Sequence, residues 1–487
     1  MTMPPTPNPP PPNPPPLVVD LDGTLIKTDL LWESLARLLR RNPLQLFAVL
    51  FWWTRGRAFL KKKLAARVTL DPATLPYNEP FLAFLREQKQ AGRKLILATA
   101  SDRQMAMPVA HHVGLFDDVL GSDGKTNLRG ANKLKVLTEK FGERGFDYAG
   151  NAAPDLAVWL GAREAIVVNA GWLLVKRIER RVNPGLIFAP DLSFISALVR
   201  CLRPQQWIKN VIIFAPALAA HRLTELPLLL RVFWAFLVFC ICASGVCMVN
   251  DIMDLDADRR HPAKKFHPFA AGNLPLPAGL VGGPLLLVTG LVMAIQLSWV
   301  FAGVTVLYLL LAVSYLWWVK SVVLLDVVFL VGLYTIRLVA GQAATGIVLS
   351  TWLLTFSLFI FLSLALVKRY VERCAAKQVE AGQYAGSGRG HEVRGLDVVV
   401  LSGAGSGCLA TLVLALYANS QSATLFYAHP GRLWLGCPLL LYWISRIWLI
   451  ARRGQMHDDP LVFALKDPAS YIVVVLAFLI LWLATGQ

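Results

Sequence analysis

The chain has 487 residues, of which 55% are hydrophobic and only 16% are charged. A mean hydropathy of +0.52 excludes an ordinary soluble protein of this length. The formal net charge of +17 does not indicate a nucleic-acid partner, because the sequence has no zinc-finger, base-stacking or helix-turn-helix pattern.

The first 16 residues, MTMPPTPNPPPPNPPP, form a proline tract without the apolar core of a signal peptide. Such a tract favours a disordered tail in the polyproline II conformation. We therefore begin the first predicted domain at residue 17.

Residues 17–170 alternate short apolar segments with helical patterns. The segments LVVDLD, KLILATAS, FDYAG and AIVVNA have the length and composition of buried parallel strands. This alternation predicts an α/β domain with helices on both faces of its sheet.

The first of these segments continues as LVVDLDGTL, which places Asp20 and Asp22 two positions apart. At the end of a strand both carboxylates point to the same side, and Gly23 lets the chain turn away. Two adjacent carboxylates repel each other unless a cation or a proton lies between them, so the motif predicts a Mg²⁺ site. A turn stabilised by aspartate caps is the simpler alternative.

The order of this motif and the polar residues at later strand ends resembles the haloacid dehalogenase (HAD) superfamily of phosphohydrolases. The resemblance implies a Rossmannoid domain with a small helical cap, in which Asp20 is the nucleophile and Asp22 the general acid/base. It also implies that Thr99 and Lys133 stabilise the transferred phosphoryl group, with Arg129 as an alternative to Lys133. The implied metal ligands are Asp20, Asp22, Asn151 and Asp155.

The segment YAGNAAPDLAVW departs from the family pattern. Asn151 stands where the family usually places an acid, whereas Asp155 is retained. An amide oxygen can bind Mg²⁺ but adds no negative charge, so weaker metal affinity is expected. A catalytically inactive domain with a regulatory or docking role is the alternative.

Residues 46–68, LFAVLFWWTRGRAFLKKKLAARV, combine aromatic side chains with a basic cluster. This composition is typical of a helix in the lipid interface, but a packed cap helix with a basic exterior explains it equally well. Residues 171–200 include the basic stretch WLLVKRIERRVNPG, and we interpret them as an interfacial linker to the membrane domain.

The domain predicted for residues 201–487 is all-α and polytopic, because apolar runs recur that are long enough to cross a bilayer. Lys and Arg concentrate after the second, fourth, sixth and eighth runs, which places those connections and the N-terminal domain on the cytoplasmic side. We expect a multi-pass protein of a bacterial inner membrane with its active sites facing the cytoplasm. The nine or so runs are 207–221, 226–249, 279–296, 299–318, 322–344, 349–367, 397–418, 431–451 and 468–486.

An aspartate-rich segment, VNDIMDLDADRR, directly follows the second run. On a continuous helix Asp251, Asp254 and Asp258 lie within about 60° of one another, with Asn250 beside them and Asp256 on the far face. Three carboxylates in one stripe predict a Mg²⁺ site that can hold substrate phosphates.

This segment resembles the first aspartate-rich motif of the UbiA superfamily, membrane transferases of nine helices that hold a diphosphate substrate through Mg²⁺. Prenyltransferases of the superfamily carry a second cluster, D-x-x-x-D. The corresponding stretch here, SYLWWVKSVVLLDVV, has Tyr315, Lys320 and Asp326 but no second aspartate at that spacing.

Basic segments of the membrane half closely resemble those of decaprenyl-phosphate phosphoribosyltransferases. These enzymes join the ribose of phosphoribosyl diphosphate to a polyprenyl phosphate and release diphosphate. A positive-inside anchor explains each cation separately, so individual roles stay open. The candidate substrate-binding residues are Arg203, Lys209, Asn250, His261, Lys264, Lys265, Tyr315, Lys320, Asp326, Lys368 and Arg369.

Together these resemblances imply a bifunctional enzyme that uses Mg²⁺, phosphoribosyl diphosphate and a polyprenyl phosphate within the lipid bilayer. The first half would remove the 5-phosphate that the second half has attached, giving a precursor of arabinofuranose donors. The alternative is a prenyltransferase with an aromatic acceptor and an inactive or regulatory HAD-like domain. Prenyl chain length, transfer of the intermediate between sites and assembly into a homo-oligomer stay open.

Overall fold

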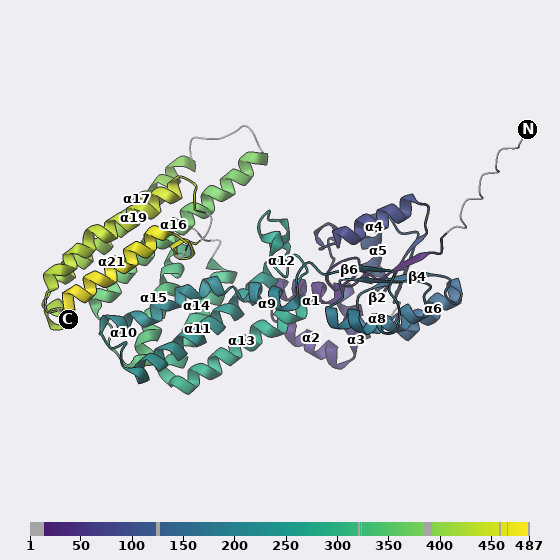
Figure 1. Cartoon of the computed structure of the whole chain (residues 1–487), viewed down its shortest axis with the longest axis horizontal. Helices are drawn as coiled ribbons and strands as arrows, with labels where there is room; N and C mark the ends of the chain where they lie inside the picture. The colour runs from purple at the N-terminus through teal and green to yellow at the C-terminus, as the bar shows by residue number, and fades with distance from the viewer. Residues whose placement is uncertain are drawn as a thin grey trace, which may run out of the picture. The chain divides into compact units, whose positions relative to one another are not determined.

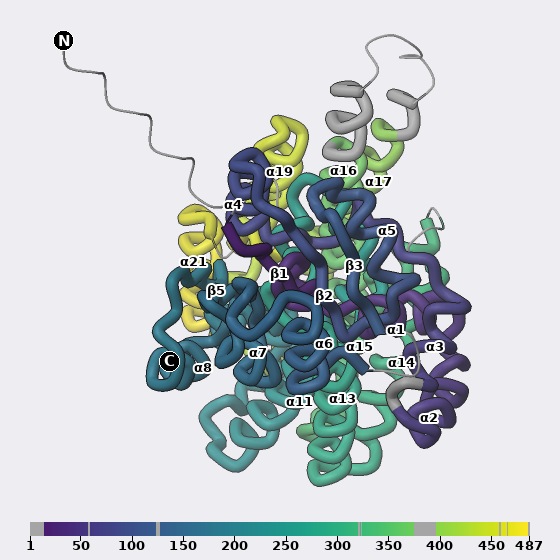
Figure 2. Tube along the Cα trace, turned by 90° about the vertical axis from the view of Figure 1, so that its right-hand side faces the viewer, coloured from purple at the N-terminus to yellow at the C-terminus, as the bar shows by residue number. Residues whose placement is uncertain are grey.

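The computed structural model describes residues 14–122, 127–319, 322, 324–383, 392–456, 459–464 and 466–485. The chain divides into two compact units, and its course is shown in Figures 1 and 2. The first unit combines Met1–Leu202 with Cys247–Pro284, and the second combines Arg203–Val246 with Leu285–Gln487. The aspartate-rich segment 250–258 therefore belongs to the same unit as the N-terminal domain.

Six parallel strands form the sheet of the first unit, in the order β3-β2-β1-β4-β5-β6. Four of them lie in the predicted segments, which confirms the α/β prediction. The strands are β1 (Leu17–Val19), β2 (Leu95–Asp102), β3 (Asp118–Ser122), β4 (Asp147–Gly150), β5 (Ala165–Val168) and β6 (Leu186–Phe188).

Two strands, β3 and β6, were not predicted from the sequence. The β3 segment, DVLGS, is too polar to be recognised as a buried strand, and β6 has only three residues. β6 pairs with β5 although it lies within residues 171–200, so part of the predicted linker contributes to the sheet.

Alternate residues of β1 pack on opposite faces of the sheet, as the period of a strand requires. Leu17 and Val19 join the core under α4 and α5, whereas Val18 joins the core under α6, α7 and α8. Figure 2 shows these two helix groups on opposite sides of the strands. The helices are α4 (Glu79–Gln90), α5 (Arg103–Val113), α6 (Ala131–Phe141), α7 (Leu156–Gly161) and α8 (Trp172–Glu179).

A helical insertion between β1 and β2 forms the small cap that was predicted. Asp29 begins its first helix by accepting a hydrogen bond from the backbone N–H of Leu31. Leu38, Val49, Trp52 and Leu60 join the three helices in a common core. The helices are α1 (Leu30–Arg41), α2 (Gln45–Thr54) and α3 (Arg57–Ala65), followed by the short η1 (Pro72–Thr74).

Eight helices among the described residues are long and apolar enough to cross a membrane. The first predicted run, 207–221, is instead divided between two short helices, because Pro204 and Pro216 each start a new one. The eight are α11 (Leu226–Met253), α13 (Leu276–Leu297), α14 (Trp299–Trp317), α15 (Leu325–Thr345), α16 (Thr351–Gln383), α17 (Glu392–Ala418), α19 (Gly436–Arg452, extended at its start by η6, Pro430–Leu435) and α21 (Pro468–Thr485).

Two large apolar cores of the second unit lie around α15, α16 and α19 and around α11, α14 and α15. Figure 1 shows α16, α17, α19 and α21 running side by side. Leu310 of α14, Leu401 of α17 and Val475 of α21 are among many large apolar side chains that stay exposed on the long helices of this unit. Such a surface is stable when lipid covers it, so the chain is a multi-pass membrane protein. Shorter elements are η3 (Pro204–Phe214), α10 (Ala215–Ala219), α18 (Gln421–Phe426) and α20 (Pro460–Ala464).

Candidate active sites

The first candidate site lies where β1 ends in the first unit. Lys133, on α6, donates a hydrogen bond of 2.6 Å from Nζ to Oδ1 of Asp20, and one of 2.9 Å to the hydroxyl of Tyr148. That hydroxyl donates in turn to Oδ1 of Asp155 at 2.8 Å. Both Lys133 and Asp20 are buried. The structure thus brings the predicted Asp20, Lys133 and Asp155 together, and Arg129 lines the same pocket.

Asp22 is held by a second set of donors. Its Oδ1 accepts from the backbone N–H of Leu30 at 2.9 Å, where α1 begins. Its Oδ2 accepts from Thr99 at 3.2 Å and from the hydroxyl of Ser101 at 2.6 Å. Sequence reasoning named Thr99 but missed Ser101, although it lies in the same segment, LILATAS.

Burial raises the pKa of Asp20 to about 7, and the negative charges of Asp155 and Asp22 add to the rise. The Lys133 ammonium opposes it. Asn151 lies against this turn: a Cβ on Gly23 would come within 1.9 Å of its Nδ2. Carboxylate and amide oxygens around a pocket with excess negative charge fit Mg²⁺. The pocket, with a cavity volume of about 370 Å³, is lined by Asp20, Asp22, Asn151, Asp155 and residues of the cap.

The second candidate site is the aspartate-rich segment of the same unit. Ligand atoms of Asp251, Asp258 and His267 all lie within 4.8 Å of one another, and Nδ1 of His267 is 3.2 Å from Oδ2 of Asp258. Asp251 and Asp258 are buried. Two carboxylates and an imidazole this close together fit a divalent cation.

Asp254 is not part of this group of three. Helix α11 ends at Met253, and Asp254 precedes α12 (Leu255–Arg260) with a non-helical ψ of 9°. The stripe expected on one continuous helix is therefore interrupted in its middle. His267 was missed because it follows η4 (Lys264–Phe266) in a segment without helical periodicity.

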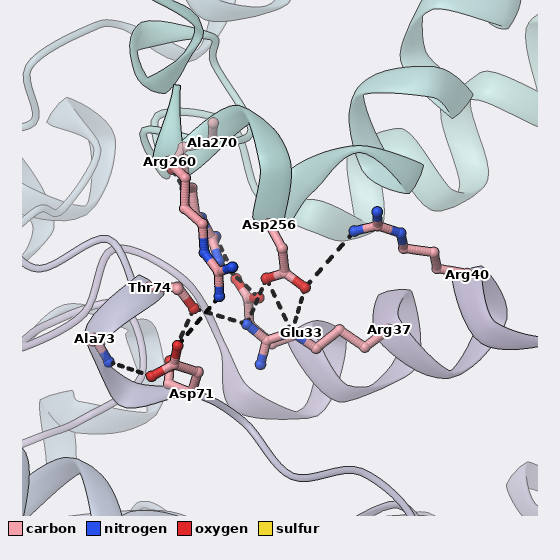
Figure 3. Close-up of polar contacts among 10 residues, drawn as sticks. Glu33, Arg37, Arg40, Asp71, Ala73, Thr74, Asp256, Arg260 and Ala270 are labelled. Atoms are coloured by element: carbon pink, nitrogen blue, oxygen red, sulfur yellow. Dashed lines mark hydrogen bonds and ion pairs between the residues drawn. The ribbon is translucent and has the colours of Figure 1, made fainter. Parts of the chain in front are cut away.

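A network of ion pairs joins the cap helix α1 to α12 (Figure 3). Arg259 donates to Glu33 at 2.6 and 3.0 Å, and both side chains are almost fully buried. Arg37 donates to Asp256 at 2.6 Å and to Thr74 at 3.0 Å. Burial disfavours the charged form of Asp256, but the hydrogen bonds and positive charge of Arg37 outweigh burial, so the pKa of Asp256 is lowered. Asp256 thus fixes α12 to the cap.

The basic loop after α12 is largely exposed. Lys264, Lys265 and His261 all face solvent, and Nδ1 of His261 accepts a hydrogen bond from the backbone N–H of Ala263 at 3.2 Å. Asn250, at the end of α11, is half-buried.

The remaining candidate residues form a charged group in the second unit. The Arg369 guanidinium lies 3.1 Å from Oδ2 of Asp326, which is 1% exposed, and 3.6 Å from Glu372. Lys209 donates to Asp459 at 2.8 Å. Lys368 lies close enough to Glu372, Asp459, Tyr315 and Asp326 to interact with all of them.

Sequence reasoning missed three members of this group. Asp459 lies in a loop described only as basic, although the two adjacent aspartates of HDDP, Asp459 among them, were a visible signal. Asn210 accepts at 2.9 Å from Arg337, a buried arginine in the middle of α15. A buried arginine within a membrane span is itself a signal of a polar site. Arg203 starts η3 with a φ of 50°, and Lys320 lies outside the described residues.

Two family models match the chain. One, described as the UbiA prenyltransferase family, matches residues 211–466, and the other, described as haloacid dehalogenase-like hydrolase, matches residues 17–157. Over 459 residues the chain is 36% identical to the uncharacterized protein y4nM of Sinorhizobium fredii, an alignment that covers 94% of this chain and 88% of that protein.

Two further relatives align with less of the chain. The nodulation protein NoeC of Azorhizobium caulinodans is 33% identical over 290 residues, which are 59% of this chain and 92% of that protein. The decaprenyl-phosphate phosphoribosyltransferase of Mycobacterium tuberculosis is 36% identical over 204 residues, which are 41% of this chain and 68% of that enzyme.

Proposed function

This chain belongs to the UbiA prenyltransferase family and carries a HAD-like hydrolase domain at its N-terminus, and on that premise we propose that it is a bifunctional enzyme. Its membrane half transfers 5-phosphoribose from phosphoribosyl diphosphate to a polyprenyl phosphate. Its HAD-like half then removes the 5-phosphate, which leaves polyprenyl-phosphoryl-ribose. Both sites face the cytoplasm of a bacterium, from its inner membrane.

The ion pair between Arg369 and Asp326 is the main observation in favour of phosphoribosyl diphosphate over a prenyl diphosphate as the substrate. Where a prenyltransferase would have a second acidic cluster for metal, this chain has one buried carboxylate beside a guanidinium. Lys209 and Lys368 add positive charge to the same group. Such a site suits substrates with several phosphates. The 36% sequence identity over 204 residues to a decaprenyl-phosphate phosphoribosyltransferase supports the same substrate class.

In the transferase step Asp251, Asp258 and His267 would hold Mg²⁺. Bound there, Mg²⁺ supplies charge stabilisation to a departing diphosphate. Lys209, Lys368 and Arg369 of the second unit would bind substrate phosphates. An oxygen of the lipid phosphate then forms the new bond to that carbon as its bond to diphosphate breaks.

In the phosphatase step Asp20 attacks the phosphorus of the 5-phosphate, and Asp22 gives a proton to the leaving sugar oxygen. Lys133 and Thr99 stabilise charge on the phosphoryl group. Water then attacks the aspartyl phosphate, with Asp22 taking its proton, and inorganic phosphate leaves. Asp20, Asp22, Asn151 and Asp155 would hold the Mg²⁺ that balances the charge of this pocket.

The test uses the full chain in lipid nanodiscs with phosphoribosyl diphosphate, Mg²⁺ and a polyprenyl phosphate. Mass spectrometry of the wild-type products should show lipid that has gained a pentose, and Asp20→Asn should accumulate lipid that has gained a pentose phosphate. Glu139→Gln, at an exposed position of α6, is the matched control. Absence of any pentosylated lipid from wild type would overturn the transferase assignment.

Asn151 favours a second candidate, a prenyltransferase whose HAD-like domain is inactive, because an acid is missing from the metal site. That enzyme would convert a prenyl diphosphate and an aromatic acceptor, and its product would gain a prenyl mass instead of a pentose. Offering both substrate pairs to the same preparation separates the two functions.

A further inference from the structure

Helix α2 of the cap leaves most of its apolar side chains uncovered. Its buried residues are Val49 and Trp52, whereas Phe47 is 73% exposed, Leu50 57% and Phe51 55%. Leu44, just before the helix, is 72% exposed. A continuous aromatic and aliphatic surface of this kind marks an interaction site.

The position of this surface within the first unit indicates what covers it. The core shared by α1, α2 and α3 also includes Met253 and Leu280. Met253 is the last residue of α11 and Leu280 lies in the first turns of α13, and both helices are candidate membrane spans. The core that α2 shares with α1 and α3 therefore packs against the ends of two candidate spans.

Charge around α2 matches an anionic lipid surface. The sequence has no Asp or Glu between residues 42 and 70 but has six Lys and Arg residues there. The guanidinium of Arg55 lies 4.6 Å from the ring centre of Phe51, and that of Arg67 lies 4.4 Å from the ring of Trp52. Aromatic rings with cations at their edge are typical of helices that lie in the lipid interface.

The cap helices α1, α2 and α3 also form one wall of the pocket that contains Asp20. Trp32, Trp53, Lys61 and Lys62 line the pocket that contains Asp20. Trp53 keeps 44% of its surface exposed, and its ring centre is 6.2 Å from that of Trp32. A phosphate carried on a lipid could therefore reach Asp20 while its tail stays in the bilayer.

We propose that α2 docks the phosphatase onto the anionic bilayer surface, with Phe47, Leu50 and Phe51 among the acyl chains, and that the pocket selects phosphomonoesters displayed on lipid over soluble ones. The choice of substrate rests on the proposed phosphatase function, whereas docking does not.

The docking test places one environment-sensitive fluorescent amino acid at position 47 of the full chain in nanodiscs that contain phosphatidylglycerol. Its emission should shift to the blue and be quenched by brominated acyl chains, whereas the same probe at position 139 on α6 should be unaffected. Equal quenching at both positions, or none at position 47, overturns the docking proposal whether or not the phosphatase is active.

The substrate test compares hexadecyl riboside 5-phosphate in nanodiscs with methyl riboside 5-phosphate, which has the same head group. Wild type should have a KM at least tenfold lower for the hexadecyl substrate. Phe47→Asp/Phe51→Asp should remove this advantage and leave turnover of the methyl substrate unchanged, which also reports intact folding. A preference that survives the double substitution overturns the lipid-selection proposal. Hydrolysis of neither substrate would contradict the phosphatase function itself. The fluorescent probe at position 47 would then still test the docking proposal on its own.

Discussion

Arg259 and Glu33 lie 226 positions apart in the chain, yet they form a buried ion pair with two hydrogen bonds of 2.6 and 3.0 Å. Arg259 also donates to the backbone carbonyl of Ala270 at 3.1 Å. One end of this pair belongs to the phosphatase cap and the other follows Asp258 directly. Folding of the N-terminal domain and the geometry of the aspartate-rich segment are therefore linked.

Glu33→Gln should test this link. It leaves the Arg259 guanidinium buried without a counter-charge, which costs about 3–5 kcal/mol when one partner of a buried pair is removed. We expect a thermal midpoint several degrees lower in detergent and a clear loss of pentosyl transfer. Glu139→Gln should change neither. Wild-type transferase activity in Glu33→Gln would show that α12 is positioned without the cap.

Asp29 gives a pH-dependent prediction. Burial, and then the charge of Asp22, raise the pKa of Asp29 from 3.8 to about 7. Because the folded state disfavours the charged form, wild type should lose stability as the pH rises from about 4 through 7. Asp29→Asn keeps an oxygen that can cap α1 but carries no charge. Without metal, its thermal midpoint should exceed that of wild type at pH 8 and match it near pH 4. An equal difference at both pH values would contradict this account.

Asn151→Asp should strengthen the metal site of the phosphatase. It adds a carboxylate beside Gly23, next to Asp20 and Asp22, so Mg²⁺ affinity should rise on the order of tenfold. The measurement is the Mg²⁺ dependence of methyl riboside 5-phosphate hydrolysis. An unchanged half-saturating concentration would mean that position 151 does not contact the metal.

Arg369→Met should separate phosphate binding from stability. It leaves the buried Asp326 unpaired and removes a cation, so pentosyl transfer should fall by about a hundredfold and the thermal midpoint should drop. Adding Asp326→Asn should restore much of the thermal midpoint but not the activity. Recovery of both in the double variant would assign the pair a purely structural role.

Much of the fold could be predicted from local sequence patterns. Asp20, Asp22 and Thr99 were found because strand ends carry short, recognisable motifs, and the spans were found because a bilayer demands long apolar runs. The strand β6 was missed because three residues carry no period. Asp459 and Glu33 were missed because each pairs with a residue far away in sequence, and His267 was missed because its segment has no helical periodicity. Asp254 was grouped with Asp251 and Asp258 because the break after Met253 leaves no mark in the helical spacing.

The most direct measurement is the mass of the lipid made by Asp258→Asn beside Asp20→Asn, from phosphoribosyl diphosphate and polyprenyl phosphate with Mg²⁺. If the carboxylates of the first unit hold the metal for transfer, Asp258→Asn yields no pentosylated lipid, and Asp20→Asn yields only the phosphorylated form. Pentosylated lipid from Asp258→Asn at the wild-type rate, or dephosphorylated lipid from Asp20→Asn, would contradict the account.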